Sequence, residues 1–199
     1  MTIEGRLQRQ PPLLTDAWEG VITTTPETVI RPLTAADAAA YRAIRMEALH
    51  DTPEAFSASP EDEADLSDAD MALRCEPAVP GVTIGAFSGA TLIGTACYLP
   101  ERRAKTRHKA TMVAVYLKPA WRKTGVGRAM VEAIIAHARK ERVILLCNAT
   151  MHNLPARRLY HALGFVPYGV ERDALIINGQ SYDEELLMLD LRQDQPAAE

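Results

Sequence analysis

The sequence has few of the features that mark exported, membrane or metal-binding proteins. Only three of its 199 residues are cysteines and none forms a Cys-x-x-Cys pair, so we expect reduced thiols rather than a disulfide framework or a zinc site. No apolar run approaches the roughly 20 residues that cross a bilayer. The first ten residues lack the apolar segment of a secretory signal. These absences predict a cytoplasmic protein with no membrane partner and no bound metal.

An overall excess of positive charge is also absent. The formal net charge is −4, whereas non-specific nucleic-acid binding depends on many cations that neutralise phosphates. We therefore expect no nucleic-acid partner. The apolar share of 47% and the chain length suit one globular domain with a sizeable core.

Hydrophobic periodicity and turn residues predict an α/β fold. We expect an N-terminal extension over 1–27, either flexible or strapped onto the domain, a domain over 28–191, and a C-terminal tail over 192–199. The expected sheet is mixed and mostly antiparallel, with about six to seven strands and helices on both faces. Its strands are predicted at 28–33, 82–87, 91–99, 111–117, 143–149 and in a hairpin over 166–191 that turns at Asn178-Gly179. Helices are predicted over 34–49, 59–77, from the glycine loop near 125 to about 140, and over 153–163.

The most informative motif is the loop that follows the strand predicted at 111–117. It reads Arg122-Lys123-Thr124-Gly125-Val126-Gly127 and opens a helix, with Arg128 just behind it. The first backbone N–H groups of a helix have no intrahelical acceptor, and the helix dipole adds positive potential there. A Cβ at Gly125 or Gly127 would hold a ligand away from these donors. The loop therefore predicts a phosphate cradle, although Met130 stands where a dinucleotide fingerprint needs a third small residue.

A second motif lies about thirty residues downstream, as Asn153…Ala156…Leu159-Tyr160…Gly164-Phe165. The two motifs in this order resemble the acyl-CoA site of the GNAT superfamily of N-acetyltransferases. The resemblance implies the GNAT fold, in which the family's fourth and fifth strands splay apart. It also implies acetyl-CoA as cosubstrate.

The same resemblance assigns expected roles to individual residues. Backbone groups of Val115, Tyr116 and Leu117 would pair with the pantetheine amides. The loop Arg122, Lys123, Thr124, Gly125, Val126, Gly127 and Arg128 would receive the pyrophosphate, and Asn153 and Ala156 would border the pantetheine and adenine arm. Tyr160 would contact the cofactor and act as the catalytic acid, because a phenol can hydrogen-bond to or protonate the departing thiolate.

The general base has no clear candidate in the sequence. Many GNAT enzymes carry a carboxylate on the fourth strand, but 111–116 has none. A free amine could come from solution, from a water relay, or through Glu63, His108, His152 or Asp183. Acyl transfer through Cys147 is a different mechanism, and a thiol on an apolar strand is poorly suited to it.

The function expected from these features is acetyl transfer from acetyl-CoA to a primary amine of a small molecule or peptide. The run 47–56 resembles the acceptor-side segment of a bacterial GNAT subgroup, and the acidic stretch 61–70 either attracts a cationic amine or is a solvated helix start. An inactive acyl-CoA-binding sensor is the alternative, and a nicotinamide-dependent dehydrogenase is a third reading. A homodimer is possible through an edge strand or the final hairpin.

Overall fold

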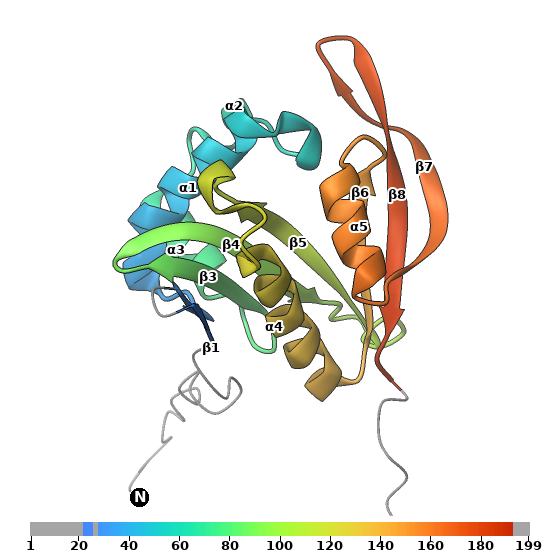
Figure 1. Cartoon of the computed structure of the whole chain (residues 1–199), viewed down its shortest axis with the longest axis horizontal. Helices are drawn as coiled ribbons and strands as arrows, with labels where there is room; N and C mark the ends of the chain where they lie inside the picture. Colours follow the sequence, from blue (N-terminus) through green and yellow to red (C-terminus); the bar gives the residue numbers. More distant parts are fainter. Residues whose placement is uncertain (1–21, 26–27, 193–199) are drawn as a thin grey trace, which may run out of the picture.

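The structure, a computed structural model, is organised around one mixed β-sheet (Figure 1). It describes residues 22–25 and 28–192. Within these residues the sheet has eight strands in the order β1-β2-β3-β4-β5-β6-β8-β7. Neighbouring strands are antiparallel except β5 and β6, which run parallel. The predicted α/β class and the mixed, mostly antiparallel sheet are confirmed.

The elements have the following bounds. The strands are β1 (Ile22–Thr25), β2 (Thr28–Pro32), β3 (Val82–Ser88), β4 (Thr91–Pro100), β5 (Lys109–Leu117), β6 (Ile144–Thr150), β7 (Val166–Ile177) and β8 (Gln180–Asp190). The helices are α1 (Ala38–Asp51), α2 (Pro60–Glu63), α3 (Asp68–Cys75), α4 (Val126–Glu141) and α5 (Leu154–Ala162). Three short 3-10 turns are η2 (Ala35–Asp37), η3 (Pro53–Ala55) and η4 (Pro119–Trp121).

Strand β1 accounts for the difference between the expected six to seven strands and the observed eight. It falls within the segment predicted as an N-terminal extension, and it pairs antiparallel with β2. The rest of that prediction, residues 1–21 and 26–27, lies outside the described residues, as do residues 193–199 of the predicted tail.

Two helix starts in the α2–α3 segment correct a sequence prediction. The single helix expected over 59–77 is two helices, because two separate serines cap helix starts. The backbone N–H of Ser59 donates to Asp62 and that of Ser67 donates to Asp70, at 2.7 and 2.9 Å. Each pair is a reciprocal capping box, which favours a new helix start over continuation of the previous one.

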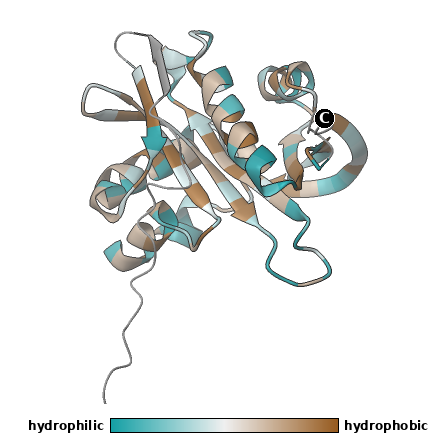
Figure 2. Cartoon of the chain, turned by 90° about the horizontal axis from the view of Figure 1, so that it is seen from below, coloured by the Kyte–Doolittle hydropathy of each residue, from teal (hydrophilic) through white to brown (hydrophobic). Residues whose placement is uncertain are grey.

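Separate hydrophobic clusters cover the two faces of the sheet. The larger cluster joins β3–β6 to α4, and includes Met112, Met130 and Tyr160. The smaller cluster joins α1 and α3 to the sheet, and includes Tyr41, Met71 and Tyr116. In Figure 2 the central strands carry most of the brown, hydrophobic colour, while the surrounding helices alternate brown and teal. The predicted placement of helices on both faces is therefore confirmed.

The continuous apolar run over 143–149 predicts a strand that is covered on both faces, and this prediction is wrong. Leu145, Cys147 and Ala149 are buried, but Leu146 is half-buried and Asn148 is exposed. The uncovered side begins where β6 leaves its neighbour β5. The first half of β6 therefore lies inside the sheet, and its second half lies beside the opening between the two strands.

Strands β5 and β6 diverge after a short contact. Their pairing covers only Lys109–Thr111 of β5 with Ile144–Leu146 of β6, although both strands continue beyond it (Figure 1). A bulge in β5 accompanies the divergence, because the β4–β5 register shifts between Thr95 and Cys97 and Ala114 has a φ of 53°. The splay implied by the family resemblance is present in this chain.

Candidate active site

The divergence of β5 and β6 opens into a cavity of about 610 Å³. One part of its lining comes from the diverging strands, from β8 and from α5 with its N-cap residue, and includes Val113, Ala114, Val115, Asn148, Thr150, Asn153, Ala156, Tyr160 and Glu184. The other part comes from the helices on the α1 face and includes Tyr41, Arg45, Phe56, Glu63, Leu73 and Arg74. A single cavity thus connects the two faces of the sheet through the splay. We call these parts the donor wall and the acceptor wall.

The glycine loop has the geometry of an anion cradle. Gly125 caps α4 with a φ of 93°, and Lys123 just before it has a φ of 65°. The first backbone hydrogen bond after Gly125 runs from the N–H of Ala129 to the Gly125 carbonyl, so the N–H groups of residues 126–128 have no intrahelical acceptor. A Cβ on Gly127 would lie 3.5 Å from Leu117, which leaves the backbone approachable from outside. These features fit a pyrophosphate, although the loop itself does not line the cavity.

The cations around the cradle differ in how firmly they are held. Arg122 donates from Nη2 to Asp51 at 2.5 Å and from Nε to the Leu117 carbonyl at 3.0 Å. Arg128 pairs with Glu132 at 2.9 Å. The structure records no ion pair for Lys123 within the described residues. Arg122 would therefore have to share or leave Asp51 to reach a phosphate.

Of the three residues expected to bind pantetheine, only two have backbone groups on the exposed edge of β5. The N–H of Lys118 donates to Ile93 of the β4 side, and backbone groups alternate along a strand, so the backbone of Tyr116 also faces β4. The backbone groups of Val115 and Leu117 face the splay instead. Tyr116 packs its ring on the α1 side, and its hydroxyl donates to Glu47 and Asp51, both at 3.3 Å.

The second motif forms the opposite edge of the donor wall. Asn153 caps α5, and its side-chain oxygen accepts the N–H of Ala156 at 3.2 Å. Asn153, Ala156 and Tyr160 all line the cavity. Within the described residues the buried hydroxyl of Thr150 has no hydrogen-bond partner, a cost that a polar ligand atom in the splay would offset.

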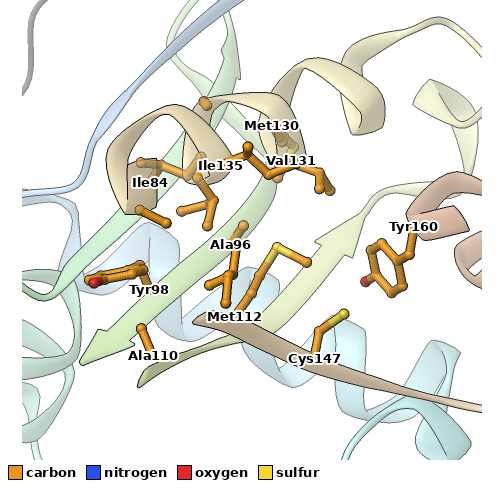
Figure 3. Close-up of a cluster of buried hydrophobic side chains, with 14 of the residues drawn as sticks. Ile84, Ala96, Tyr98, Ala110, Met112, Met130, Val131, Ile135, Cys147 and Tyr160 are labelled. Atoms are coloured by element: carbon orange, nitrogen blue, oxygen red, sulfur yellow. The ribbon is translucent and has the colours of Figure 1, made fainter. Parts of the chain in front are cut away.

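Tyr160 is held rigidly beside the splay. Its ring is 5% exposed and lies 5.7 Å from the ring of Phe165. Figure 3 shows its hydroxyl turned to the side of Met112 and Cys147. Burial raises the pKa of Tyr160 above its usual range, and the nearby Cys147 thiol adds to this effect. The phenol is therefore protonated at neutral pH and acts as a hydrogen-bond donor.

Three of the four proposed bases lie away from the cavity. His108 and His152 are exposed, and Asp183 is tied to Arg172 and to the backbone of Asp173. Glu63 does line the cavity, but Arg45 and Arg74 both pair with it, at 2.8 and 2.9 Å. Burial raises the pKa of Glu63, yet the two arginines together outweigh burial and leave that pKa lowered. A carboxylate held in this way is a poor proton acceptor.

Sequence reasoning missed a carboxylate that the fold brings to the donor wall. Glu184 of β8 lines the cavity, is 8% exposed, and accepts a hydrogen bond from the side-chain amide of Asn148. Its position comes from the β6–β8 pairing, which sets Thr150 opposite Glu184. An acidic residue in the same alternating set as Leu186 and Met188 was the available signal.

The alternative mechanism through a thiol receives no support from the geometry. Cys147 is buried, and burial raises the pKa of its thiol well above the usual range. Cys75 and Cys97 are buried free thiols as well.

Comparison with known proteins places the chain in a family. Residues 42–165, more than half of the chain, match the model of the GNAT family of acetyltransferases. The chain therefore belongs to the GNAT family of acetyltransferases. No curated protein matches it.

Solved structures share the fold at low sequence identity. A GNAT acetyltransferase from Streptococcus pneumoniae has a TM-score of 0.76 and 21% identity, with 82% of this chain and 99% of that one covered. The yncA protein of Salmonella typhimurium, solved with its cofactor acetyl-CoA, has a TM-score of 0.72 and 23% identity over 86% of this chain and 97% of its own. A phosphinothricin acetyltransferase from Sinorhizobium meliloti, also in complex with acetyl-CoA, has a TM-score of 0.72 and 21% identity over 83% of this chain and 89% of its own. The donor held in the last two structures agrees with the cosubstrate expected from the sequence.

Proposed function

We propose that this acetyltransferase moves the acetyl group of acetyl-CoA to a primary amine of a small molecule or peptide by direct attack on the thioester. The observation that carries the proposal is the cavity at the β5–β6 divergence, which Tyr160 and Glu184 line together. The thioester supplies an activated carbonyl carbon with a thiolate leaving group. The chain supplies the binding surfaces and the proton-handling groups.

The donor would bind along the donor wall. The N–H groups of residues 126–128, with Lys123 and Arg122, would receive the pyrophosphate. Val115 and Leu117 would pair with the pantetheine amides across the splay, and Asn153 with Ala156 would border the other side. Tyr116 contributes packing and a hydrogen bond to α1 rather than a backbone contact.

Tyr160 would act on the sulfur. As the C–N bond forms and the C–S bond breaks, negative charge collects on the sulfur, and the Tyr160 hydroxyl would donate a hydrogen bond to it. A phenol with a raised pKa is a weaker acid than a thiol of pKa about 8.5, so hydrogen-bond donation suits it better than complete proton transfer.

Glu184 would act on the amine. An ammonium group must lose a proton before its nitrogen can attack. Of the two carboxylates that line the cavity, Glu184 is the one for which no arginine partner is recorded within the described residues. Its contact with Asn148 fixes the carboxylate at the splay. This role supplies the base that the fourth-strand position lacks, and it argues against an inactive acyl-CoA sensor.

The first experiment is calorimetric titration of the protein with acetyl-CoA. We expect micromolar binding by the wild type and a loss of about 100-fold in Gly127→Glu, because the new carboxylate lies where the phosphates bind. Gly127→Gln is the matched control for size, and we expect it to bind more tightly than Gly127→Glu. A folded wild type that does not bind acetyl-CoA would overturn the assignment.

The second experiment measures release of the CoA thiol with a broad panel of amines. Release dependent on an amine supports the transferase. Tight acetyl-CoA binding with no release for any amine would favour the acyl-CoA sensor instead. NADH binding tighter than CoA would revive the dehydrogenase reading.

We further propose a cytoplasmic homodimer. The three free, buried cysteines suit a reducing compartment. The edge strand β7 exposes Val166, Tyr168 and Val170, which are 53%, 52% and 45% exposed, and an apolar edge of this kind suits a second copy. Sedimentation of the wild type and of Tyr168→Asp tests this: a dimer that the substitution dissociates is expected. Separately, no helix within the described residues has the length and apolar character needed to cross a membrane.

A further inference from the structure

The acceptor wall carries an ion cluster with more positive than negative charge. Arg45 of α1 and Arg74 of α3 both pair with Glu63 of α2, which is 3% exposed as a side chain. Arg45 also lies over the ring of Phe56, with 4.7 Å between the guanidinium carbon and the ring centroid. Two guanidinium groups share one carboxylate, so the cluster has a net charge of about +1.

The arginines retain donors that Glu63 does not use. Arg45 reaches Glu63 through Nε and Nη2, and Arg74 reaches it through Nη1. Within residues 28–192 no partner is recorded for Nη1 of Arg45 or for Nε and Nη2 of Arg74. The Glu63 carboxylate already contacts both arginines through its two oxygens. The remaining donors of a guanidinium suit an oxyanion, because its fork matches a carboxylate.

The other charged residue of the cavity lies on the donor wall. Only four charged side chains line the cavity within the described residues, and the fourth is Glu184. The cavity therefore has a positive end on the α1–α3 helices and a negative end at the splay, whose lining also includes Tyr160. A molecule with an anionic end and an ammonium end complements this arrangement in one orientation only.

We propose that the acceptor is an amino acid or a closely related amine that carries a carboxylate. This inference rests on the proposed acetyl transfer. The carboxylate binds the free donors of Arg74 and Arg45, and the ammonium group faces Glu184, where its nitrogen can reach the thioester. Glu63 positions the two arginines and does not contact the acceptor.

Matched pairs of amines test the proposal. We would compare kcat/KM for leucine with leucinamide and for phenylalanine with phenylalaninamide, and extend the series to acids with a longer spacing between carboxylate and amine. An amide has the more acidic ammonium group and thus more free amine at neutral pH, so chemistry alone favours the amide. We expect the best acid to exceed its amide by at least tenfold. A wild type that acetylates amides or peptides as well as the acids would overturn the proposal.

Variants of the acceptor wall make the test specific. Arg74→Gln should remove most of the preference for the acid by raising its KM, while kcat/KM for the amide changes little, and Arg74→Lys should restore part of the preference. Arg74 is 39% exposed as a side chain, so the variant can fold. Arg42→Gln is the control. Arg42 lies on α1, as Arg45 does, but it pairs with Asp68 outside the cavity. Equal losses for acid and amide in Arg74→Gln would contradict carboxylate binding there.

The outcome separates this inference from the proposed function. Thiol release with amides but no preference for acids would keep the transferase and reject the acceptor class. No thiol release with any amine would reject the transferase itself.

Discussion

The donor wall and the acceptor wall are built from different chemical groups. The donor wall, together with the glycine loop beyond the cavity, offers backbone groups on the exposed edge of β5 and at the start of α4, supported by a few polar side chains of α5 and its N-cap. The acceptor wall offers long charged side chains from three separate helices. Backbone groups are the same whatever the side chain, whereas an arginine pair depends on two particular residues. The comparison indicates that the donor site depends on main-chain geometry and the acceptor site on side-chain identity.

The largest effect should come from Tyr160, the residue proposed to act on the sulfur. Tyr160→Phe removes the hydroxyl and keeps the packing on Phe165, so we expect kcat to fall about 100-fold with little change in the KM of acetyl-CoA. Steady-state kinetics at saturating donor measures this. Tyr98→Phe is the control, because the Tyr98 hydroxyl is buried without a partner in the described residues and lies outside the cavity lining. Equal kcat values for wild type and Tyr160→Phe would show that the Tyr160 hydroxyl does not act on the sulfur.

A smaller and pH-dependent loss is expected at the negative end of the cavity. Glu184→Gln should lower kcat/KM about tenfold at pH 7, because proton acceptance by a positioned carboxylate is lost. The deficit should shrink as pH rises, since solution then supplies the free amine. The control is Glu171→Gln, which alters the exposed neighbour of Glu184 on β7. A deficit that stays constant with pH would point to a structural role.

The free energy of unfolding should also depend on an ion pair at the start of the α1 region. Asp37 caps the start of the α1 region and pairs with Arg31 through two hydrogen bonds of 2.8 Å. The hydrogen bonds from Arg31 lower the pKa of Asp37 to about 2. A lowered pKa stabilises the fold above the unfolded value near 4, and this contribution is lost as pH falls towards 2.

Asp37→Asn should therefore reduce the free energy of unfolding by about 1–2 kcal/mol at pH 7, a range reduced for the partial exposure of Arg31. Urea unfolding at pH 7 and at pH 2.5 measures it, and the two proteins should become alike at the lower pH. Asp68→Asn should change stability by less than about 0.5 kcal/mol, because the Asp68 side chain is 98% exposed. A difference that persists at pH 2.5 would show that charge is not the cause.

The smallest effect should be found beside the glycine loop, outside the cavity lining. Asp51 of α1 holds Arg122 and also accepts the Tyr116 hydroxyl. Asp51→Asn should tighten acetyl-CoA binding by about two- to fivefold, because a half-exposed ion pair contributes up to about 1 kcal/mol and a negative charge near the phosphates is removed. Calorimetry measures the change. Weaker binding would instead indicate that Asp51 orients Arg122 for the phosphates.

Local signals in the sequence were sufficient for the glycine loop, for the second motif and for most of the fold. The glycine loop is read from consecutive residues, and the Asn178-Gly179 turn is observed with φ of 51° and 78°, as the dipeptide predicts. The spacing of Thr34 and Asp37 in the sequence predicts a helix start, and the two residues form a capping box at the start of the first helical region. Such features depend on neighbours within a few residues, which a sequence displays directly.

The acceptor wall, and Glu184 on the donor wall, depend on contacts that no local pattern contains. Arg45 and Arg74 lie on different helices and meet only through Glu63, and Glu184 reaches the splay through the register of β6 with β8. Glu63 itself was correctly noticed as a titratable group, but its two arginine partners were not. The division of the second helix was missed for a different reason: the sequence prediction treats the acidic stretch 61–70 as belonging to one helix start, although Ser67 and Asp70 form a local capping box.

The bulge at Ala114 makes the opening between β5 and β6 a permanent feature of the sheet. A residue with a Cβ in the left-handed region costs about 1–2 kcal/mol, and the Thr95 hydroxyl supports this turn by donating to the Ala114 carbonyl at 3.1 Å. Removing the bulge would slide one part of β5 by one residue along β4 and exchange the faces of Tyr116 and Leu117, which pack into opposite hydrophobic clusters. Thermal motion can therefore widen or narrow the opening. Pairing β5 with β6 along their full length would require both hydrophobic clusters to come apart.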